Sequence, residues 1–177
     1  MIFVTVGSQM PFDRLVRAVD QWAAARGRSD VFAQIGSTDF LPTAISAKKY
    51  VDPLEFRRCV ETADVIVAHA GMGSIITALE CGKPMIVMPR RGSLNETRND
   101  HQVATVRHLS KHGRITVAMN EEELVGKLDS VGGPQEMDHI SPHASPVLIA
   151  TIRNFVDGKR YADELMGSGT PTQAGAR

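Results

Sequence analysis

The sequence lacks most of the features that mark membrane-spanning, secreted or nucleic-acid-binding proteins. It contains no run of about 18 apolar residues, which excludes a transmembrane helix. Its 20 basic and 20 acidic residues cancel, so no net charge draws the chain toward nucleic acid or an anionic membrane surface. It has only two cysteines, Cys59 and Cys81, which are expected to be buried thiols in a reducing compartment.

Signals for export and for metal binding are missing as well. The first residues, Met-Ile-Phe-Val-Thr-Val, carry neither a basic leader nor a cleavage site, so a first strand is expected there rather than a signal peptide. No Asp-x-Asp pair and no His/Cys cluster occurs, and nothing therefore points to a metal ion. What the chain does have is ordinary globular composition, with 42% hydrophobic residues, enough for one domain with a core.

Strand-like and helix-like segments alternate along the chain. Short β-rich runs are followed by segments whose apolar residues recur at spacings of three and four. This alternation predicts an α/β fold, a doubly wound and mostly parallel Rossmann-like sheet. Residues 1–157 are assigned to one domain and residues 158–177 to a polar, disordered tail. The predicted strands are 2–6, 31–35, 48–51, 64–68, 84–88 and 115–118, and the predicted helices are 11–25, one opening at Pro53, 71–81, 98–112, 121–129 and 141–157.

Three loops are expected at the sheet edge where ligands bind in such folds. The first is Val6-Gly7-Ser8-Gln9, between the first strand and the first helix, with Gly7 and Ser8 as its candidate contacts. A glycine there lets the backbone approach a phosphate, and the helix behind it favours negative charge. Ser8 would add a hydroxyl donor. The alternative is a plain turn before a helix.

The second loop leaves the most apolar strand and enters a helix through His69-Ala70-Gly71-Met72-Gly73-Ser74. Two glycines followed by serine leave backbone N–H groups free to hold a pyrophosphate. Ile76 stands where the dinucleotide fingerprint has its third glycine, so a nucleotide with one charged linker fits better than NAD. His69 is either a ligand contact or a structural histidine.

The third loop runs from Pro89 to Gln102. Arg90 and Arg91 are expected to supply positive charge near phosphates. Asp100, His101 and Gln102 open a helix, and such a polar cluster suits the hydroxyl groups of a sugar. A solvated loop before a capped helix is the alternative.

In combination these loops resemble the C-terminal, donor-binding half of the GT-B glycosyltransferases of family 28. The resemblance rests on residues 63–74, 82–89 and 99–102, and it covers about residues 1–130. It implies half of a GT-B fold that binds a UDP-sugar as its donor substrate and needs neither a metal ion nor another cofactor. Within the family the chain is most similar to small subunits that work with a membrane-attached partner, in dolichol-linked glycan assembly or in bacterial exopolysaccharide assembly.

The resemblance also implies roles for single residues. The backbone at Val51 would read the uracil, and His69 is the candidate catalytic residue. Many members hold the ribose with a glutamate whose place is taken here by Thr77, with Glu80 one turn further on. Ribose binding therefore falls to Glu80, to Thr77 or to neither. The diphosphate would be held by Gly7, Ser8, Gly71, Met72, Gly73 and Ser74, and the sugar by Asp100, His101 and Gln102.

A partner is implied by the same resemblance. A chain of 177 residues has no room for an acceptor-binding domain, so a membrane-anchored subunit is expected to supply it and to hold this chain at the cytoplasmic face of the membrane. The apolar helix 141–157 either packs on its own domain or docks that partner. Nucleic acid is not expected as a partner, and a homo-oligomer is left open. The alternative functions are a nucleotide-sugar epimerase or hydrolase and a non-enzymatic nucleotide-binding regulator.

Overall fold

The chain forms two compact units, Met1–Ile140 and a second unit that begins at Ser141. The sequence analysis placed residues 1–157 in a single domain, whereas the structure assigns the last helix to the second unit. The predicted tail lies outside the described residues except for Gly158. The computed structural model describes residues 1–110, 115–131 and 139–158.

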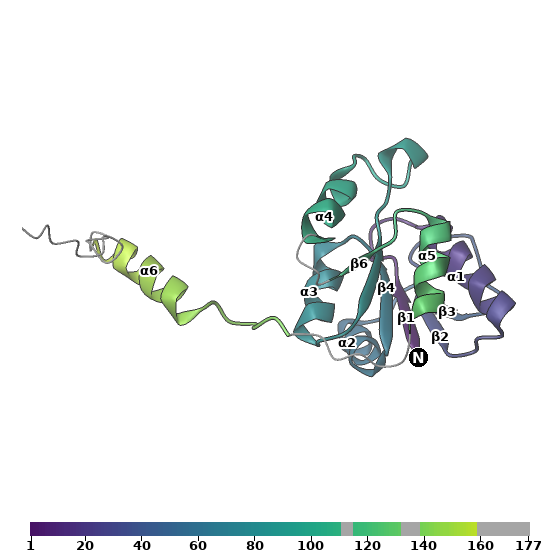
Figure 1. Cartoon of the computed structure of the whole chain (residues 1–177), viewed down its shortest axis with the longest axis horizontal. Helices are drawn as coiled ribbons and strands as arrows, with labels where there is room; N and C mark the ends of the chain where they lie inside the picture. Colours follow the sequence, from purple (N-terminus) through teal and green to yellow (C-terminus); the bar gives the residue numbers. More distant parts are fainter. Residues whose placement is uncertain (111–114, 132–138, 159–177) are drawn as a thin grey trace, which may run out of the picture. The chain divides into compact units, whose positions relative to one another are not determined.

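A parallel sheet of six strands is the centre of the first unit (Figure 1). Its strand order is β3-β2-β1-β4-β5-β6, and every neighbouring pair is parallel. The predicted doubly wound α/β fold is therefore confirmed. The strand β3 begins and ends earlier than predicted. The strands are β1 Ile2–Thr5, β2 Val31–Gln34, β3 Ser46–Lys48, β4 Val65–His69, β5 Met85–Met88 and β6 Thr116–Val117.

Helices cover both faces of this sheet. The helices α1 and α5 lie on one face, and α2, α3 and α4 lie on the other (Figure 1). A short 3-10 helix, Gly92–Leu94, interrupts the segment predicted as a loop after β5. The helices of this unit are α1 Asp13–Arg26, α2 Pro53–Thr62, α3 Met72–Glu80, α4 His101–Leu109 and α5 Glu121–Ser130.

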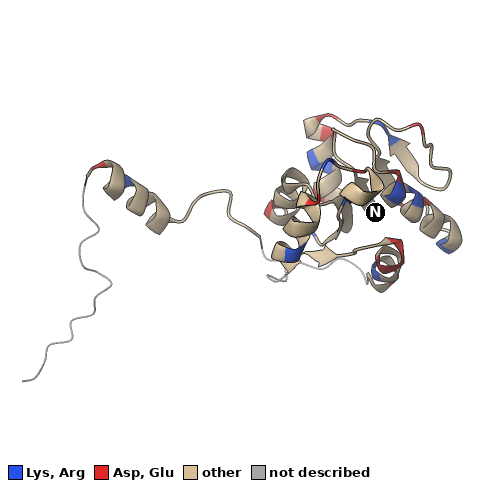
Figure 2. Cartoon of the chain, turned by 90° about the horizontal axis from the view of Figure 1, so that it is seen from above, with Lys and Arg blue, Asp and Glu red and all other residues tan. Residues whose placement is uncertain are grey.

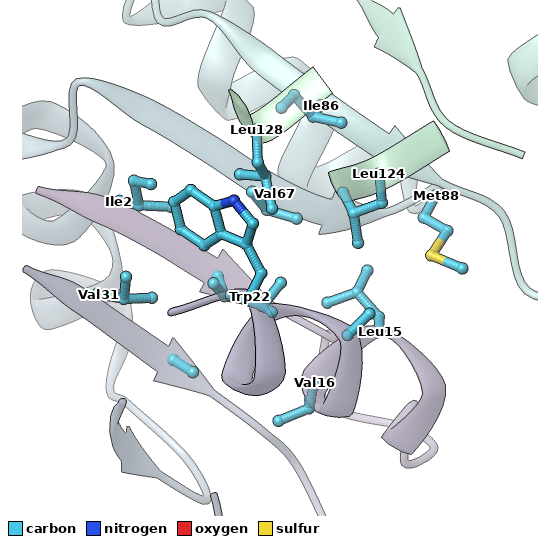
Figure 3. Packing of buried hydrophobic residues seen from close by; sticks show 14 of the residues in the cluster. Ile2, Leu15, Val16, Trp22, Val31, Val67, Ile86, Met88, Leu124 and Leu128 are labelled. Carbon is cyan, nitrogen blue, oxygen red and sulfur yellow. The ribbon is translucent and has the colours of Figure 1, made fainter. Parts of the chain in front are cut away.

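The face under α1 and α5 shows why the apolar spacing of the first helix matters. Leu15, Val16 and Trp22 project from α1 onto the sheet, and Leu124 and Leu128 project from α5 (Figure 3). All of them are buried. Burying a side chain of this size stabilises a fold by about 1.5–3 kcal/mol. Strands covered on both faces have no polar alternation, which is why β1 and β4 read as continuous apolar runs.

Two side-chain caps fix where helices begin. The carboxylate of Asp52 accepts a hydrogen bond of 2.8 Å from the backbone N–H of Glu55, so the predicted cap of α2 is confirmed. Asn120 caps α5 in the same way through the N–H of Glu123. Such caps contribute about 1 kcal/mol each.

The surface carries charges of both signs. Figure 2 shows basic and acidic residues interspersed over the elements of the first unit. In the described ranges, no helix has both the length and the apolar character needed to cross a membrane. Cys59 and Cys81 are free thiols that are half-buried rather than fully buried as predicted.

The second unit contains α6, Pro146–Val156. The predicted helix began at Ser141, but it starts later because Ser145 and Pro146 are a strong start signal. The Ser145 hydroxyl accepts a hydrogen bond of 3.2 Å from the N–H of Leu148, and Pro146 occupies the first helical position. Whether this apolar helix packs on its own domain or docks a partner stays a prediction.

Candidate functional site

A cleft of about 520 Å³ opens at the carboxyl ends of the strands. It lies beside β1 and β4, where the strand order reverses and where open parallel sheets bind ligands. Its walls are the loop after β1, the turn from β4 into α3, and the segment from the end of β5 to the first turn of α4. The predicted residues that line it are Gly7, Ser8, His69, Gly71, Met72, Gly73, Ser74, Arg90, His101 and Gln102.

Two predicted residues of the third loop lie outside the cleft lining. The Arg91 guanidinium donates a hydrogen bond to the backbone carbonyl of Met119. The Asp100 carboxylate accepts a hydrogen bond of 2.8 Å from the N–H of Gly92. Both side chains thus fasten the loop to its surroundings.

The three predicted base and ribose contacts also lie outside the lining. Val51 is half-buried just before α2. The Thr77 hydroxyl donates a hydrogen bond of 2.9 Å to the carbonyl of Gly73. The Glu80 carboxylate is 3.9 Å from the Arg57 guanidinium. No carboxylate lines the cleft among the residues that the structure describes.

Sequence reasoning missed several residues of the lining. Gln9 belongs to the predicted first loop but was not named as a contact, and Met10 follows it directly, so extending the loop by one residue would have found both. Thr105 lies one helical turn after His101, and the helical period is the signal for it. Thr97 lies inside the predicted third loop, but nothing in the sequence singles it out there.

A buried polar network holds the first loop in place. Gly7 has a φ of 76°, the left-handed conformation that favours glycine. Its carbonyl accepts a hydrogen bond of 2.9 Å from the Gln34 side-chain amide, and its N–H donates to the Thr5 hydroxyl at 3.3 Å. Thr5 donates in turn to Gln34 at 2.7 Å. The backbone at the mouth of the cleft is therefore fixed before any ligand arrives.

The His69 imidazole occupies the space between Gly7 and Gly71. A Cβ atom on Gly71 would overlap the Nε2 atom of His69, and one on Gly7 would lie 2.7 Å from its Cε1 atom. A Cβ atom on Gly73 would meet nothing within 4 Å. Two glycines of the predicted phosphate loops thus make room for a side chain.

The environment of His69 keeps its imidazole uncharged. Burial, and then the positive charge of Arg90, lower the pKa of His69 to about 4, although the Thr5 backbone carbonyl favours the protonated form. The ring is therefore neutral at pH 7 and offers one donor and one acceptor. Its Nδ1 atom is buried and has no hydrogen-bond partner within the described residues.

Arg90 is part of the cleft wall, and its side chain is almost wholly buried there. Arg90 is only 3% exposed, and its guanidinium carbon lies 4.9 Å from the centre of the Phe12 ring. Burial lowers the pKa of Arg90, but a guanidinium stays charged in a protein. The sequence analysis expected this charge near phosphates, and the structure shows that both terminal nitrogens are already engaged. They donate to the backbone carbonyls of Val6, Met10, Pro11 and Glu96.

Gln102 connects two walls of the cleft. Its Oε1 atom accepts hydrogen bonds from the N–H of Ala70 at 3.2 Å and from the N–H of Arg90 at 3.1 Å. These donors assign the carbonyl end of the amide. The amide NH₂ group is the end left for a ligand.

The arrangement suits an anion with several oxygen atoms. Helix α3 begins without a side-chain cap, so the N–H groups of its first turn have no intrahelical acceptor and favour negative charge. Arg90 adds positive charge from within the wall. Within the described ranges, no group of three or more His, Cys, Asp or Glu side chains is placed to hold a metal ion.

A larger groove of about 960 Å³ lies elsewhere, between α1 and α5. Its floor includes Trp22, Ala25 and Val125. It lies on an outer face of the sheet rather than at the strand ends. Because ligands bind at the strand ends in such sheets, the smaller cleft is the candidate site.

Known proteins match both the sequence and the fold. Residues 1–137 match the glycosyltransferase family 28 C-terminal domain. The chain is 32% identical over 127 residues to the UDP-N-acetylglucosamine transferase subunit ALG13 of Homo sapiens. The matched residues make up 64% of this chain and 10% of that protein. It thus spans about a tenth of the length of the curated relatives it matches.

Two solved structures share the fold. The glycotransferase of kitacinnamycin superposes with a TM-score of 0.54 at 23% identity, over 73% of this chain and 35% of that chain. The NMR structure of ALG13 superposes with a TM-score of 0.54 at 16% identity, over 85% of this chain and 93% of that chain. At these identities the likeness concerns the fold alone.

Proposed function

Because the chain belongs to the glycosyltransferase family 28 C-terminal domain family, we propose that it binds a UDP-sugar and transfers the sugar as one subunit of a glycosyltransferase. The resemblance predicted from the sequence is thereby confirmed, while the activity is our inference. UDP-N-acetylglucosamine is the donor to test first, since the relatives similar to this chain carry that sugar nucleotide in their name.

The observation that carries the proposal is the cleft itself. It presents backbone N–H groups, a neutral imidazole and a positioned amide, with one buried cation beside them and no lining carboxylate among the described residues. A diphosphate needs donors and positive charge, and a sugar needs fixed polar groups. Both requirements meet at one sheet edge.

The transfer is proposed as direct displacement at the anomeric carbon. The acceptor hydroxyl oxygen forms the new bond to that carbon, the bond to the β-phosphate oxygen breaks, and the acceptor proton passes to a base. Backbone N–H groups of the cleft would stabilise the leaving diphosphate. With a pKa of about 4, His69 is poorly matched to general-base work at neutral pH, so we assign it to contact with the diphosphate.

A second polypeptide is part of the proposal. We expect a membrane-anchored subunit to bind a lipid-linked acceptor and to place this chain at the cytoplasmic face of the membrane, in polysaccharide or glycan assembly. The word subunit in the name of the relatives supports a partner. The open cleft would then face the acceptor that the partner presents.

The direct test is sugar transfer from UDP-N-acetylglucosamine. Radiolabelled donor is mixed with the purified chain, with membranes of the source organism, or with both, and lipid extracts are counted. Labelled lipid only in the combined sample supports the proposal. Hydrolysis or epimerisation of the donor by the chain alone would favour the epimerase or hydrolase, and tight binding without turnover in any sample would favour the regulator.

Replacing Gln102 tests the proposed sugar contact. Gln102→Glu keeps an acceptor for the N–H groups of Ala70 and Arg90 but removes the amide donor and adds negative charge. We expect its affinity for UDP-N-acetylglucosamine to fall about tenfold or more, in line with the loss of a donor to a polar ligand. Calorimetric titration measures the affinity. An unchanged affinity for UDP-N-acetylglucosamine would remove Gln102 from the sugar site.

Gln102→Ala is the companion variant. It loses the bridge between the two walls together with the donor. It should therefore lose affinity for UDP as well as for the sugar nucleotide. The comparison separates the amide's contact with the ligand from its part in holding the walls.

A further inference from the structure

We propose that Arg90, buried in the cleft wall with its guanidinium engaged by backbone carbonyls, attracts the diphosphate without touching it, and that His69 takes up one proton when the diphosphate binds. The inference rests on the proposed function and specifies how the same site holds its anion. It joins two observations that the binding proposal leaves unused: a buried cation held only by carbonyls and a buried ring nitrogen without a partner.

The Arg90 charge has no counter-ion at contact distance. No salt bridge joins it to a carboxylate within the described residues, and its hydrogen bonds go to backbone carbonyls. The Glu96 carboxylate, the nearest charge that favours the cation, is itself bound to Arg14 at 2.6 Å. A buried charge is screened far less than an exposed one. The field of this guanidinium therefore extends into the cleft.

His69 lies within that field. The imidazole lies close to the backbone of Gly7 and Gly71. Burial and the Arg90 charge lower its pKa, whereas the Thr5 carbonyl raises it. One nitrogen of the ring can therefore accept a proton, but burial and the neighbouring cation keep it unprotonated at neutral pH.

A bound diphosphate reverses this balance. Its negative charges offset the Arg90 field, and an opposite charge within about 4–6 Å raises a histidine pKa by roughly 1–3 units. The protonated ring donates from both nitrogens, so one N–H reaches the Thr5 carbonyl and the other reaches a phosphate oxygen. The proton comes from solvent. Of the described cleft residues, the ionisable ones are His69, Arg90 from the end of β5, and His101 from α4, while the β1 loop and the α3 turn contribute none.

The sign of the pH dependence follows. A ligand that raises the pKa of His69 binds more tightly as the pH falls through the pKa of the complex. The gain is about tenfold for each unit by which the two pKa values differ. It levels off below the pKa of the free protein, which is about 4. At alkaline pH the affinity no longer changes with the protonation of His69.

The test measures His69 directly. The ¹H and ¹³C signals of its imidazole are followed by NMR from about pH 4 to 8, with and without saturating UDP-N-acetylglucosamine. The diphosphate of this ligand is esterified at both ends, so its own charge stays constant over that range. Calorimetry near pH 5, between the pKa values expected for the free protein and the complex, in buffers of different ionisation enthalpy then counts the protons taken up. A pKa rise of at least one unit on binding, with proton uptake, is expected.

Variants identify the groups responsible. His69→Gln should abolish the proton uptake, whereas His101→Gln, which removes the other titratable ring of the cleft, should retain it. Arg90→Lys keeps a charge at the same place, while Arg90→Met removes it. In the free protein the pKa of His69 should rise in Arg90→Met and stay low in Arg90→Lys. If Arg90→Met does not fold, Arg90→Lys together with His69→Gln still decides the question through the uptake.

Each negative outcome has a distinct meaning. Binding of the sugar nucleotide with an unchanged His69 pKa and no proton uptake overturns this inference and leaves the proposed function standing. Proton uptake that survives in His69→Gln overturns it in the same way. No binding at any pH by a correctly folded chain overturns the proposed function, and this inference falls with it.

Discussion

Gly71→Ala is expected to lower the affinity for UDP-N-acetylglucosamine by about tenfold or more and to destabilise the fold, whereas Gly73→Ala should leave the fold intact. A methyl group on Gly71 would overlap Nε2 of His69, whereas one on Gly73 enters open space. The same edge of the imidazole also lies close to Gly7, so the ring is closely approached by both glycines. Forcing an extra methyl into a packed site costs about 1–3 kcal/mol.

The two variants form a matched pair. Both replace glycine by alanine in the same turn, and Gly73 lies in the first turn of α3, where alanine is the better helix former by up to about 1 kcal/mol. Urea denaturation should therefore show Gly71→Ala less stable than the unmodified chain and Gly73→Ala equal or more stable. Calorimetric titration gives the affinities. Identical behaviour of the two variants would mean that His69 does not depend on the glycine beside it.

Arg90→Met is expected to reduce the free energy of unfolding by about 3–5 kcal/mol. The change removes the donors of four carbonyls, those of Val6, Met10, Pro11 and Glu96. A buried polar group that loses its partner costs about 1–3 kcal/mol, and water entering the site recovers part of this. Methionine preserves much of the apolar contact with the Phe12 ring, so the loss reports mainly on the hydrogen bonds.

Arg91→Met is the control for this experiment. Arg91 follows Arg90 directly and precedes the 3-10 helix Gly92–Leu94. Within the described residues, however, its guanidinium donates one hydrogen bond, to the Met119 carbonyl, instead of four. Its replacement should cost about 1 kcal/mol or less. Equal losses in the two variants, measured by urea denaturation, would show that the buried guanidinium is not what ties the first loop to the third.

The two arginines also show where sequence reasoning stops. They are neighbours in one basic loop, and nothing in the spacing distinguishes them. Their fates differ because the carbonyls of residues 6–11, about 80 positions away in the chain, surround one guanidinium and not the other. Charge can be read from a sequence, but burial of that charge depends on contacts between distant segments.

The glycines of the second loop carry a similar lesson. Their pattern predicts a tight turn into a helix at the sheet edge, and α3 does start there, at Met72. The pattern was interpreted as room for phosphate, whereas Gly71 also makes room for His69. A missing side chain indicates that something approaches closely, and only the fold reveals what that is.

Strand and helix order could be predicted because the central strands are buried on both faces and the long helices have one apolar stripe. Edges were harder. The strand β3 is exposed along its whole length, so its sequence carries little hydrophobic signal. It was placed at residues 48–51 rather than at Ser46–Lys48. The predicted base contact at Val51 lies near this region, the ribose contacts Thr77 and Glu80 lie in α3, and all of them rest on the resemblance and stay predictions.

The position of the cleft beside β1 and β4 ties ligand recognition to the integrity of the whole sheet. Its walls come from residues as far apart in the chain as Val6 and Thr105, so no fragment shorter than about this span can assemble it. Any nucleotide that occupies it must therefore stabilise the native state against unfolding, by about 2.7 kcal/mol at a concentration one hundred times its dissociation constant. A thermal-shift screen of nucleotides against the purified chain would thus rank its natural ligands before any acceptor or partner is known.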